Sequence, residues 1–226
     1  MNLLAIDTSA SSMSLGVRTA AEDVYRVIDS GMKHSRDILP NILSILAESG
    51  IGLNQLDALA FARGPGSFTG LRIAAGVVQG IAYGLSIPVI PVSNLAAIAR
   101  KLGREEGCDN VVVALAAREQ EVYMGAYMNC TAVYPELSGE EVVVEPANFP
   151  ELPSGRWHGA GNSQTFFADL VTLSEVRFET VSEVAQPSSQ DLLDMAAYRM
   201  RDSDYVDALN ARPEYVRHQV ASPPSK

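Results

Sequence analysis

The stretch from Leu56 to Val92 constrains the fold more than any other part of the chain. Leu56–Ala62 has the largely apolar composition of a strand buried on both faces. Thr69–Leu85 is expected to be a helix, and Pro88–Val92 a second apolar strand. A strand, a helix and a strand joined by short connections predict parallel pairing of the two strands. The chain is therefore expected to have an α/β fold.

Three short strands are predicted before this unit. Leu3–Asp7 is apolar, Met13–Arg18 alternates with a period of two, and Val24–Ile28 follows after a short turn, which indicates an antiparallel meander. Apolar residues then recur at intervals of three and four over 38–46, the spacing of a helix.

Two residues indicate where this helix begins and ends. Pro40 favours a start near Asp37, or a kink before it, because proline lacks the N–H that a helix interior uses. Gly50 suits the left-handed position just past the helix end.

The second half of the chain echoes the first in outline. Further helices and strands are predicted at Leu95–Leu102, Val111–Ala116, Glu121–Tyr127, Glu141–Glu145, Arg156–Asn162 and Gln190–Met200. Irregular loops are expected between Tyr134 and Pro153 because prolines and acids are frequent there. The polar joint Glu105–Gly107 is a natural boundary. We therefore expect two lobes, residues 1–106 and 107–226, with a last segment that could pack back on the first lobe.

The charge of the chain bears on its partners. Its 226 residues include 17 Lys and Arg and 27 Asp and Glu, a formal net charge of −10. Proteins that grip nucleic acid unaided usually show a basic stripe, because phosphate contacts dominate affinity. Strong, direct binding of RNA or DNA is therefore not expected.

Cysteine and histidine are scarce and scattered. Cys108 and Cys130 lack CxxC spacing, and His34, His158 and His218 have no second ligand at metal-binding spacing. Neither a disulfide framework nor a metal site is predicted. The N-terminus has no basic region before its apolar run, and the apolar stretch 73–92 is interrupted by prolines and glycines. We expect a cytoplasmic protein that does not bind membranes.

Two polar turns are candidate sites. Gly64–Gly70 joins a buried strand to a helix, so it is either a structural turn capped by Ser67 or Thr69, which we favour, or a cradle for an anion. It lacks the Gly-Lys-Ser/Thr of a Walker A loop and the Gly-x-Ser-x-Gly of a nucleophile elbow. Asp7, Thr8 and Ser9 end the first strand, where they either cap a β-turn or contact a nucleotide phosphate or its metal.

Two predicted helices have residues that a single contact with the core does not explain. The first has six large apolar residues, Ile38, Leu39, Ile42, Leu43, Ile45 and Leu46. The second carries Gly76, Gly80 and Gly84 one turn apart, and glycine inside a helix costs about 1 kcal/mol relative to alanine. A close contact within the chain or with a partner is expected to compensate for them.

These segments together resemble one family, the TsaB (YeaZ) family of tRNA threonylcarbamoyladenosine biosynthesis proteins. The resemblance covers nearly the whole chain. It is carried by 5–9, Lys33–Ser35, Gly64–Arg72, Val92–Leu95, Ala117–Arg118 with Glu121–Tyr123, and Pro213–Arg217. It implies a two-lobed ASKHA fold, like that of actin and sugar kinases, in which each lobe is a mixed sheet with flanking helices.

The family resemblance also implies a supporting role. TsaB-like proteins bind the catalytic paralogue TsaD, joined by the ATPase TsaE, and reach tRNA only through that complex. TsaD holds its metal with a His-x-x-x-His pair, where this chain has Asn94 and Ile98, and neither supplies an imidazole. Ala116 stands where the family usually has Asp on a hairpin. We therefore predict a scaffold with no catalytic residue, metal or intrinsic cofactor, and ATP or ADP bound only within the complex.

The resemblance places the TsaD contact on the two N-terminal helices, and the same face is expected to form a homodimer when TsaD is absent. The predicted interface residues are Ile38, Leu39, Ile42, Leu43, Leu71, Arg72, Ala75, Val78 and Gln79. The alternative function is an enzyme acting alone, either an ATP-dependent kinase-like protein or a peptidase, for which Asp7 and the glycine loop are the strongest arguments.

Overall fold

The computed structural model describes residues 1–216 except 30, 32, 119–120 and 174–175. Its first sheet has the strand order β3-β2-β1-β4-β5. The predicted meander is confirmed as β1 (Leu3–Asp7), β2 (Ser12–Arg18) and β3 (Asp23–Asp29). The predicted parallel pairing is also confirmed, because β4 (Ala58–Gly64) runs parallel to β1 and β5 (Val89–Ser93) runs parallel to β4.

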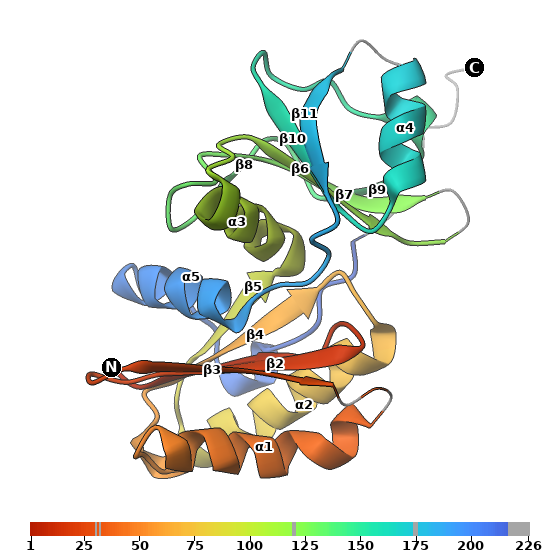
Figure 1. Cartoon of the computed structure of the whole chain (residues 1–226). Coiled ribbons are helices and arrows are strands. Elements are labelled where there is room, and N and C mark those ends of the chain that lie inside the picture. The colour runs from red at the N-terminus through yellow and green to blue at the C-terminus, as the bar shows by residue number, and fades with distance from the viewer. Residues whose placement is uncertain (30, 32, 119–120, 174–175, 217–226) are drawn as a thin grey trace, which may run out of the picture.

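Two helices cover one face of this sheet, α1 (His34–Glu48) and α2 (Phe68–Leu85), with the short 3₁₀ helix η1 (Leu53–Gln55) after α1 (Figure 1). They share one apolar cluster with the sheet. Its members from the two helices are Ile38, Ile42, Ile45, Leu46, Ala74, Ala75, Val78 and Ala82. Of the six apolar residues that predicted α1, the helix therefore buries Ile38, Ile42, Ile45 and Leu46 against the sheet and leaves Leu39 and Leu43 exposed.

The start of α1 differs from the prediction. The helix begins at His34, so Pro40 lies inside it and not in the first turn. Pro40 and Arg36 are both exposed, so water can satisfy the Arg36 carbonyl that the missing N–H leaves unbonded. The end is as predicted, because Gly50 follows the helix with a φ of +70°.

The second sheet has the order β11-β10-β6-β7-β8, with β9 also paired to β7. Its strands are β6 (Val111–Ala116), β7 (Val122–Met128), β8 (Glu136–Leu137), β9 (Val142–Val144), β10 (Trp157–Gly161) and β11 (Phe178–Ser182). The 3₁₀ helix η2 (Pro146–Asn148) and the helix α4 (Gln164–Leu173) lie on the same side of the molecule as β9. The sequence did not predict β8, β11 or α4.

Two helices lie between the sheets, α3 (Asn94–Glu106) and α5 (Ser189–Arg201), as Figure 1 shows. One apolar cluster joins them to β1 and β4 of the first sheet and to β6 of the second. Gly16 of β2 lets α5 approach, because a Cβ there would lie 2.9 Å from the Leu193 side chain. The Asp191 carboxylate of α5 is fully buried and accepts two hydrogen bonds from Arg104 of α3, at 2.9 and 3.0 Å.

The end of the described chain returns to the first sheet. After α5, Val206 forms an antiparallel bridge with Val89 of β5, and the 3₁₀ helix η3 (Ala208–Asn210) packs against α2. Two mixed sheets with flanking helices confirm the predicted α/β class. The limits of the two lobes, 1–106 and 107–226, stay a prediction.

One described helix, α2, is long and apolar enough to cross a membrane by length and composition alone. A core helix of a globular protein passes the same test, and α2 packs Ala74, Val78 and Ala82 against the first sheet. Burial in the fold therefore accounts for one side of α2, and its other side is exposed.

Candidate functional site

The turn after β1 is held by hydrogen bonds within the chain. Asp7 Oδ1 accepts a bond of 2.8 Å from the Ser9 backbone N–H, the arrangement of an Asx turn. Thr8 Oγ1 donates to the Gly70 carbonyl at 2.8 Å, and Asn94 Nδ2 donates to Ser9 Oγ at 2.7 Å. Asp7, Thr8 and Ser9 are all buried. The geometry supports the structural role considered for this turn, and contact with a nucleotide stays a prediction.

The carboxyl group of Asp7 is buried, and this burial changes its pKa. Burial raises its pKa to about 6, although the hydrogen bonds from Ser9 and the charge of His34 act in the opposite direction. Raised carboxyl pKa values occur in catalytic sites and in structural networks. Asp7 is only 1% exposed, so a substrate would reach it only if the turn moved.

Two glycines bring the loop 64–70 against the same turn. A Cβ on Gly70 would lie 1.8 Å from the Thr8 carbonyl oxygen, and one on Gly66 would lie 2.7 Å from Ser9 Cβ. The Ser67 N–H donates to the Ser9 carbonyl at 2.8 Å, and Ser67 Oγ caps α2 by accepting from the Gly70 N–H at 3.3 Å. The favoured interpretation of the loop, a turn with a helix cap, therefore matches the structure.

Asn94 and Ile98, which stand where the resemblance places metal-binding histidines, both serve the fold. Asn94 Oδ1 accepts from the Gly64 N–H at 2.8 Å, so the amide joins the glycine loop to Ser9. Ile98 is fully buried in the cluster between the sheets. Within the described part of the chain, no group of three or more His, Cys, Asp or Glu could hold a metal ion.

The described histidines lie in separate places. His34 Nε2 bonds to the Ala10 carbonyl at 2.8 Å, and His158 Nδ1 bonds to Thr180 Oγ1 at 2.9 Å. His218 lies outside the described residues. Ala116, which stands where the resemblance places an aspartate, contributes a backbone contact: its N–H donates to Asn162 Oδ1 at 2.8 Å.

A carboxylate that the sequence did not reveal links the two sheets. Glu141 Oε1 accepts hydrogen bonds from Ser93 Oγ, at the end of β5, and from the Tyr127 hydroxyl of β7. Burial and the neighbouring Glu141 raise the pKa of Tyr127 well above its usual value. This contact depends on how the two halves pack, so no local sequence pattern indicates it.

The nine residues predicted for partner contact fall into two groups. Five of them are buried: Ile38, Ile42, Ala75 and Val78 in the apolar cluster under the first sheet, and Leu71 beside Gly64 at the end of β4. Their expected place on the surface is corrected, because the sheet and the paired helices fill the wide apolar face. Leu39, Leu43 and Arg72 are exposed, and Gln79 is partly buried with its Nε2 bonded to the Ala211 carbonyl at 2.9 Å. Contact of these four with a partner stays a prediction.

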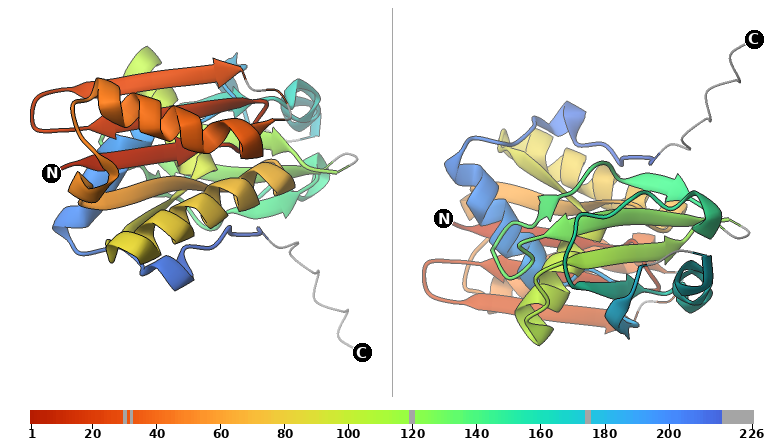
Figure 2. Two further views of the ribbon diagram at one scale, coloured as in Figure 1. Left: turned by 90° about the horizontal axis from the view of Figure 1, so that it is seen from below. Right: turned by 90° about the horizontal axis from the view of Figure 1, so that it is seen from above.

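The exposed residues of α1 and α2 form an apolar surface, which we call the α1/α2 face. The large side chains on it are Leu39, Leu43, Phe68 and Tyr83, which are 52%, 54%, 56% and 73% exposed. Gly76, Gly80 and Gly84 lie on α2, and a Cβ on any of them would meet nothing within 4 Å. The close contact expected for these glycines is therefore not made by the described residues of the chain. Figure 2 shows the two helices side by side on the outer side of the first sheet.

The segment 213–216 lies against one end of this face. The Glu214 N–H donates to the Arg63 carbonyl at 2.9 Å, and its carboxylate pairs with the Arg63 guanidinium at 2.5 Å. Arg72 lies 3.6 Å from the centre of the Phe68 ring and donates to the Tyr215 hydroxyl at 3.1 Å. Contacts with β4 and α2, on either side of the glycine loop, therefore hold Glu214 and Tyr215 of the Pro213–Arg217 motif in place. Arg217 lies outside the described residues.

Known protein families and relatives match the sequence of this chain. Residues 29–156 match the family described as "TsaD: tRNA N6-adenosine threonylcarbamoyltransferase". The chain is 36% identical to the "tRNA threonylcarbamoyladenosine biosynthesis protein TsaB" of Haemophilus influenzae, over 97% of this chain and 95% of that protein. It is 33% identical to the Escherichia coli protein of the same name, over 98% and 96%.

Two solved structures from Pseudomonas aeruginosa have the same fold. "YeaZ" superimposes with a TM-score of 0.85 at 34% identity, over 95% of this chain and 99% of that one. A protein described as having similarity to peptidase YEAZ superimposes with a TM-score of 0.87 at 34% identity, over 96% and 99%. The sequence relatives and these structures confirm the predicted two-lobed ASKHA-like fold. The chain belongs to the TsaB (YeaZ) family, whose curated members are named as tRNA threonylcarbamoyladenosine biosynthesis proteins.

Proposed function

We propose that this protein takes part in tRNA threonylcarbamoyladenosine biosynthesis as a non-catalytic subunit. It binds a TsaD-type transferase, works together with the ATPase TsaE, and meets tRNA only through their complex. The relatives named TsaB, at 36% and 33% identity over almost the whole chain, support the place in this pathway. The net charge of −10 supports a protein that does not bind RNA strongly by itself, so that its partners make the contacts with the tRNA.

The observation that carries the proposal is the α1/α2 face. Exposed apolar patches mark interaction sites, and aromatic residues are enriched at the cores of protein interfaces. Leu39 and Leu43 supply exposed apolar side chains on α1, and Phe68 and Tyr83 supply them on α2. The open positions of Gly76, Gly80 and Gly84 let a partner helix approach the α2 backbone closely. The same face can form a homodimer when TsaD is absent.

The proposal that the chain does not catalyse alone is supported by the contacts of the side chains considered for catalysis, which are bonded or buried within the fold. Asp7, Thr8 and Ser9 are bonded within the turn and its neighbours. Asn94 and Ile98 stand in place of imidazoles, one bonded inside the fold and the other in the core. ATP or ADP then binds only within the assembled complex, in the cytoplasm, with no membrane involved.

Reconstitution tests this proposal. Modification of a tRNA substrate is measured with purified TsaD, TsaE, ATP and the threonylcarbamoyl donor, with and without this chain. Full activity should require the chain, and Leu39→Asp with Leu43→Asp should lower it at least tenfold. Asp7→Asn should keep it within about threefold, because that side chain only holds a turn.

A matched control uses two exposed valines away from the α1/α2 face. Val133→Asp with Val171→Asp changes the same number of charges, at residues that are each 39% exposed, and should leave activity unchanged. Turnover of ATP or of peptide by the chain alone, abolished by Asp7→Asn, would establish the alternative enzyme instead.

A further inference from the structure

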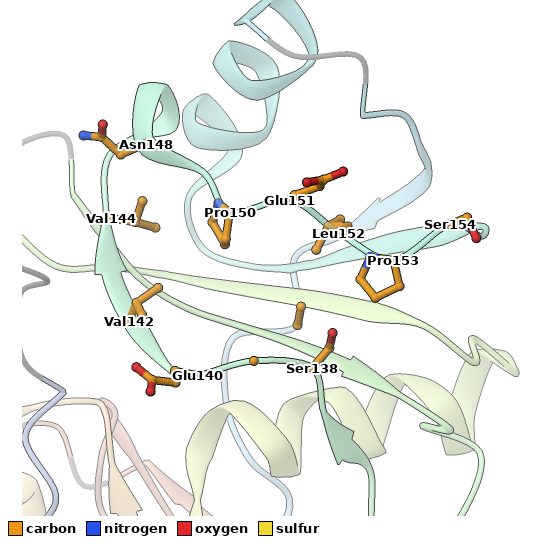
Figure 3. Close-up of a pocket in the computed structure, with 12 residues that line it drawn as sticks. Ser138, Glu140, Val142, Val144, Asn148, Pro150, Glu151, Leu152, Pro153 and Ser154 are labelled. Atoms are coloured by element: carbon orange, nitrogen blue, oxygen red, sulfur yellow. The ribbon is translucent and has the colours of Figure 1, made fainter.

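The second lobe contains a cavity that the proposed function does not use. Its volume is about 590 Å³, within the range of ligand sites. It lies between the turn 138–140, the strand β9 with Ala126 of β7, and the loop 148–154 (Figure 3). Figure 1 places β9 at the opposite end of the molecule from α1 and α2. A molecule bound here would leave the α1/α2 face free.

The floor and the facing wall of the cavity are apolar. Ala126, Val142 and Val144 form the floor and are 2%, 7% and 7% exposed. Figure 3 shows the loop residues Pro150, Leu152 and Pro153 across from β9. A bond of 2.9 Å from Trp157 Nε1 to the Pro153 carbonyl holds this loop, and each proline ring fixes its own φ. The cavity is therefore formed before any ligand arrives.

The surroundings of the cavity are strongly acidic. Residues 121–155 include six Glu and no Lys, Arg or His. Two of these acids, Glu140 and Glu151, line the cavity, and both are exposed. Neither forms a salt bridge with another described residue. In Figure 3 the two carboxylates lie apart, Glu140 next to Val142 and Glu151 on the loop between Pro150 and Leu152.

We propose that this cavity docks a basic, extended segment of a partner protein, in which Lys or Arg residues flank an apolar side chain. The apolar side chain enters between β9 and the loop, where burial is favourable by about 25 cal/mol per Å² of apolar surface. The flanking cations pair with Glu140 and Glu151, and such rim charges select the partner and speed its association. An acidic segment of the same shape is repelled.

A peptide titration of the full chain tests the proposal. The probe is a synthetic Lys-Leu-Lys-Val-Lys-Leu-Lys peptide, and the comparison peptides carry Glu or Ser in place of each Lys. The fluorescence of Trp157, the single tryptophan of the chain, reports on the loop because its indole is bonded there. Saturable binding of the Lys peptide is expected at low salt, at least tenfold tighter than that of either comparison peptide, and weaker at 0.5 M salt.

Two charge-reversal variants separate this site from the general acidity of the protein. Glu140→Lys with Glu151→Lys should weaken binding of the Lys peptide at least tenfold. Glu136→Lys with Glu183→Lys makes the same change in net charge at exposed positions that do not line the cavity, and should change binding less than twofold. An equal loss in both variants, equal binding of the Ser peptide, or no binding of the Lys peptide would each overturn the proposal. Circular dichroism checks that both variants are folded.

Discussion

Gly70 and Gly76 lie on the same helix but differ in what surrounds them. A Cβ on Gly70 would lie 1.8 Å from the Thr8 carbonyl oxygen, a backbone atom that cannot move aside without opening the turn. A Cβ on Gly76 would meet nothing within 4 Å. One glycine is therefore required by the fold, and the other is not.

Alanine at each position tests this difference. Gly70→Ala should destabilise the protein by several kcal/mol or prevent folding, because the turn and the helix start would have to separate. Gly76→Ala, the matched control on α2, should stabilise it by about 0.5–1 kcal/mol through helix propensity. Urea unfolding measures both changes. Equal effects would show that the contact between the loop and the turn is not as close as described.

Asp7 couples the turn after β1 to pH. Its pKa is about 6 in the folded chain, against 3.8 for the free side chain, because burial disfavours the charged form. Below pH 3.8 the protonated carboxyl contributes its full share to the free energy of unfolding. This contribution is lost as the pH rises through about 6, because the carboxyl of the unfolded chain releases its proton at lower pH than that of the folded chain.

Asp7→Asn removes this titration and keeps an acceptor for the Ser9 N–H. The free energy of unfolding of the variant, relative to that of the unchanged protein, should rise by about 2 kcal/mol between pH 4 and pH 7, because part of the 3.8-to-6 shift lies below pH 4. Denaturant unfolding at the two pH values measures it. A difference that does not change with pH would mean that the Asp7 carboxyl is not buried as described.

Residue by residue, local chemistry was predictable and long-range contact was not. The Ser67 cap and the left-handed Gly50 follow from rules that act within one turn of helix. The burial of Ile38 and Leu71 depends on where the sheet lies, and the bonds from Ser93 and Tyr127 to Glu141 depend on how the sheets approach. No spacing in the sequence encodes such contacts.

At the scale of elements, α2 combines a buried stripe with an open row of glycines. The isolated chain would be more stable with alanine in that row. Gly80→Ala should therefore raise the unfolding midpoint of the chain and yet weaken TsaD binding about tenfold, because the added methyl group keeps the partner helix away. Thermal unfolding and calorimetric titration measure the two effects. A gain in stability with unchanged binding would remove the glycine row from the interface.

The elements that the sequence did not predict have clear physical reasons. β8 has two residues, too few to show an alternating pattern. β11 has exposed or half-buried residues at every position, so no apolar run distinguishes it. Within α4, Phe166, Phe167 and Leu170 have helical spacing and pack in the core, so the sequence does carry a local signal for this helix.

At the scale of the molecule, the ion pair between α3 and α5 supports the layer between the sheets. Arg104 donates two hydrogen bonds to Asp191, which is fully buried, and burial raises the pKa of Asp191 although Arg104 opposes the shift. Removing one partner of such a pair costs more than removing both, because it leaves a buried charge uncompensated.

Arg104→Met should therefore destabilise the protein by about 3–5 kcal/mol, and the double variant Arg104→Met with Asp191→Leu should recover most of the loss. Arg36→Met, which breaks the exposed pair with Asp37, is the control and should leave stability nearly unchanged. Chemical denaturation measures all three. If the double variant were less stable than the single one, the pair would not bear on stability in this way.

The overall plan was predictable because it follows from the order of elements. A meander and a strand–helix–strand unit fix the first sheet, and the apolar strand at 111–116 begins the second. The return of α5 to β1 and β2 could not be read from the sequence, because its apolar stripe fits any facing surface.

The central claim is that the α1/α2 face binds a TsaD-type partner, and calorimetric titration of the chain with purified TsaD tests it most directly. Leu39→Asp with Leu43→Asp should weaken the affinity at least a hundredfold, because two charges would lie in an apolar interface core. Val133→Asp with Val171→Asp should bind like the unchanged chain. Undiminished binding by the Leu39 and Leu43 variant, with its fold intact, would contradict the account.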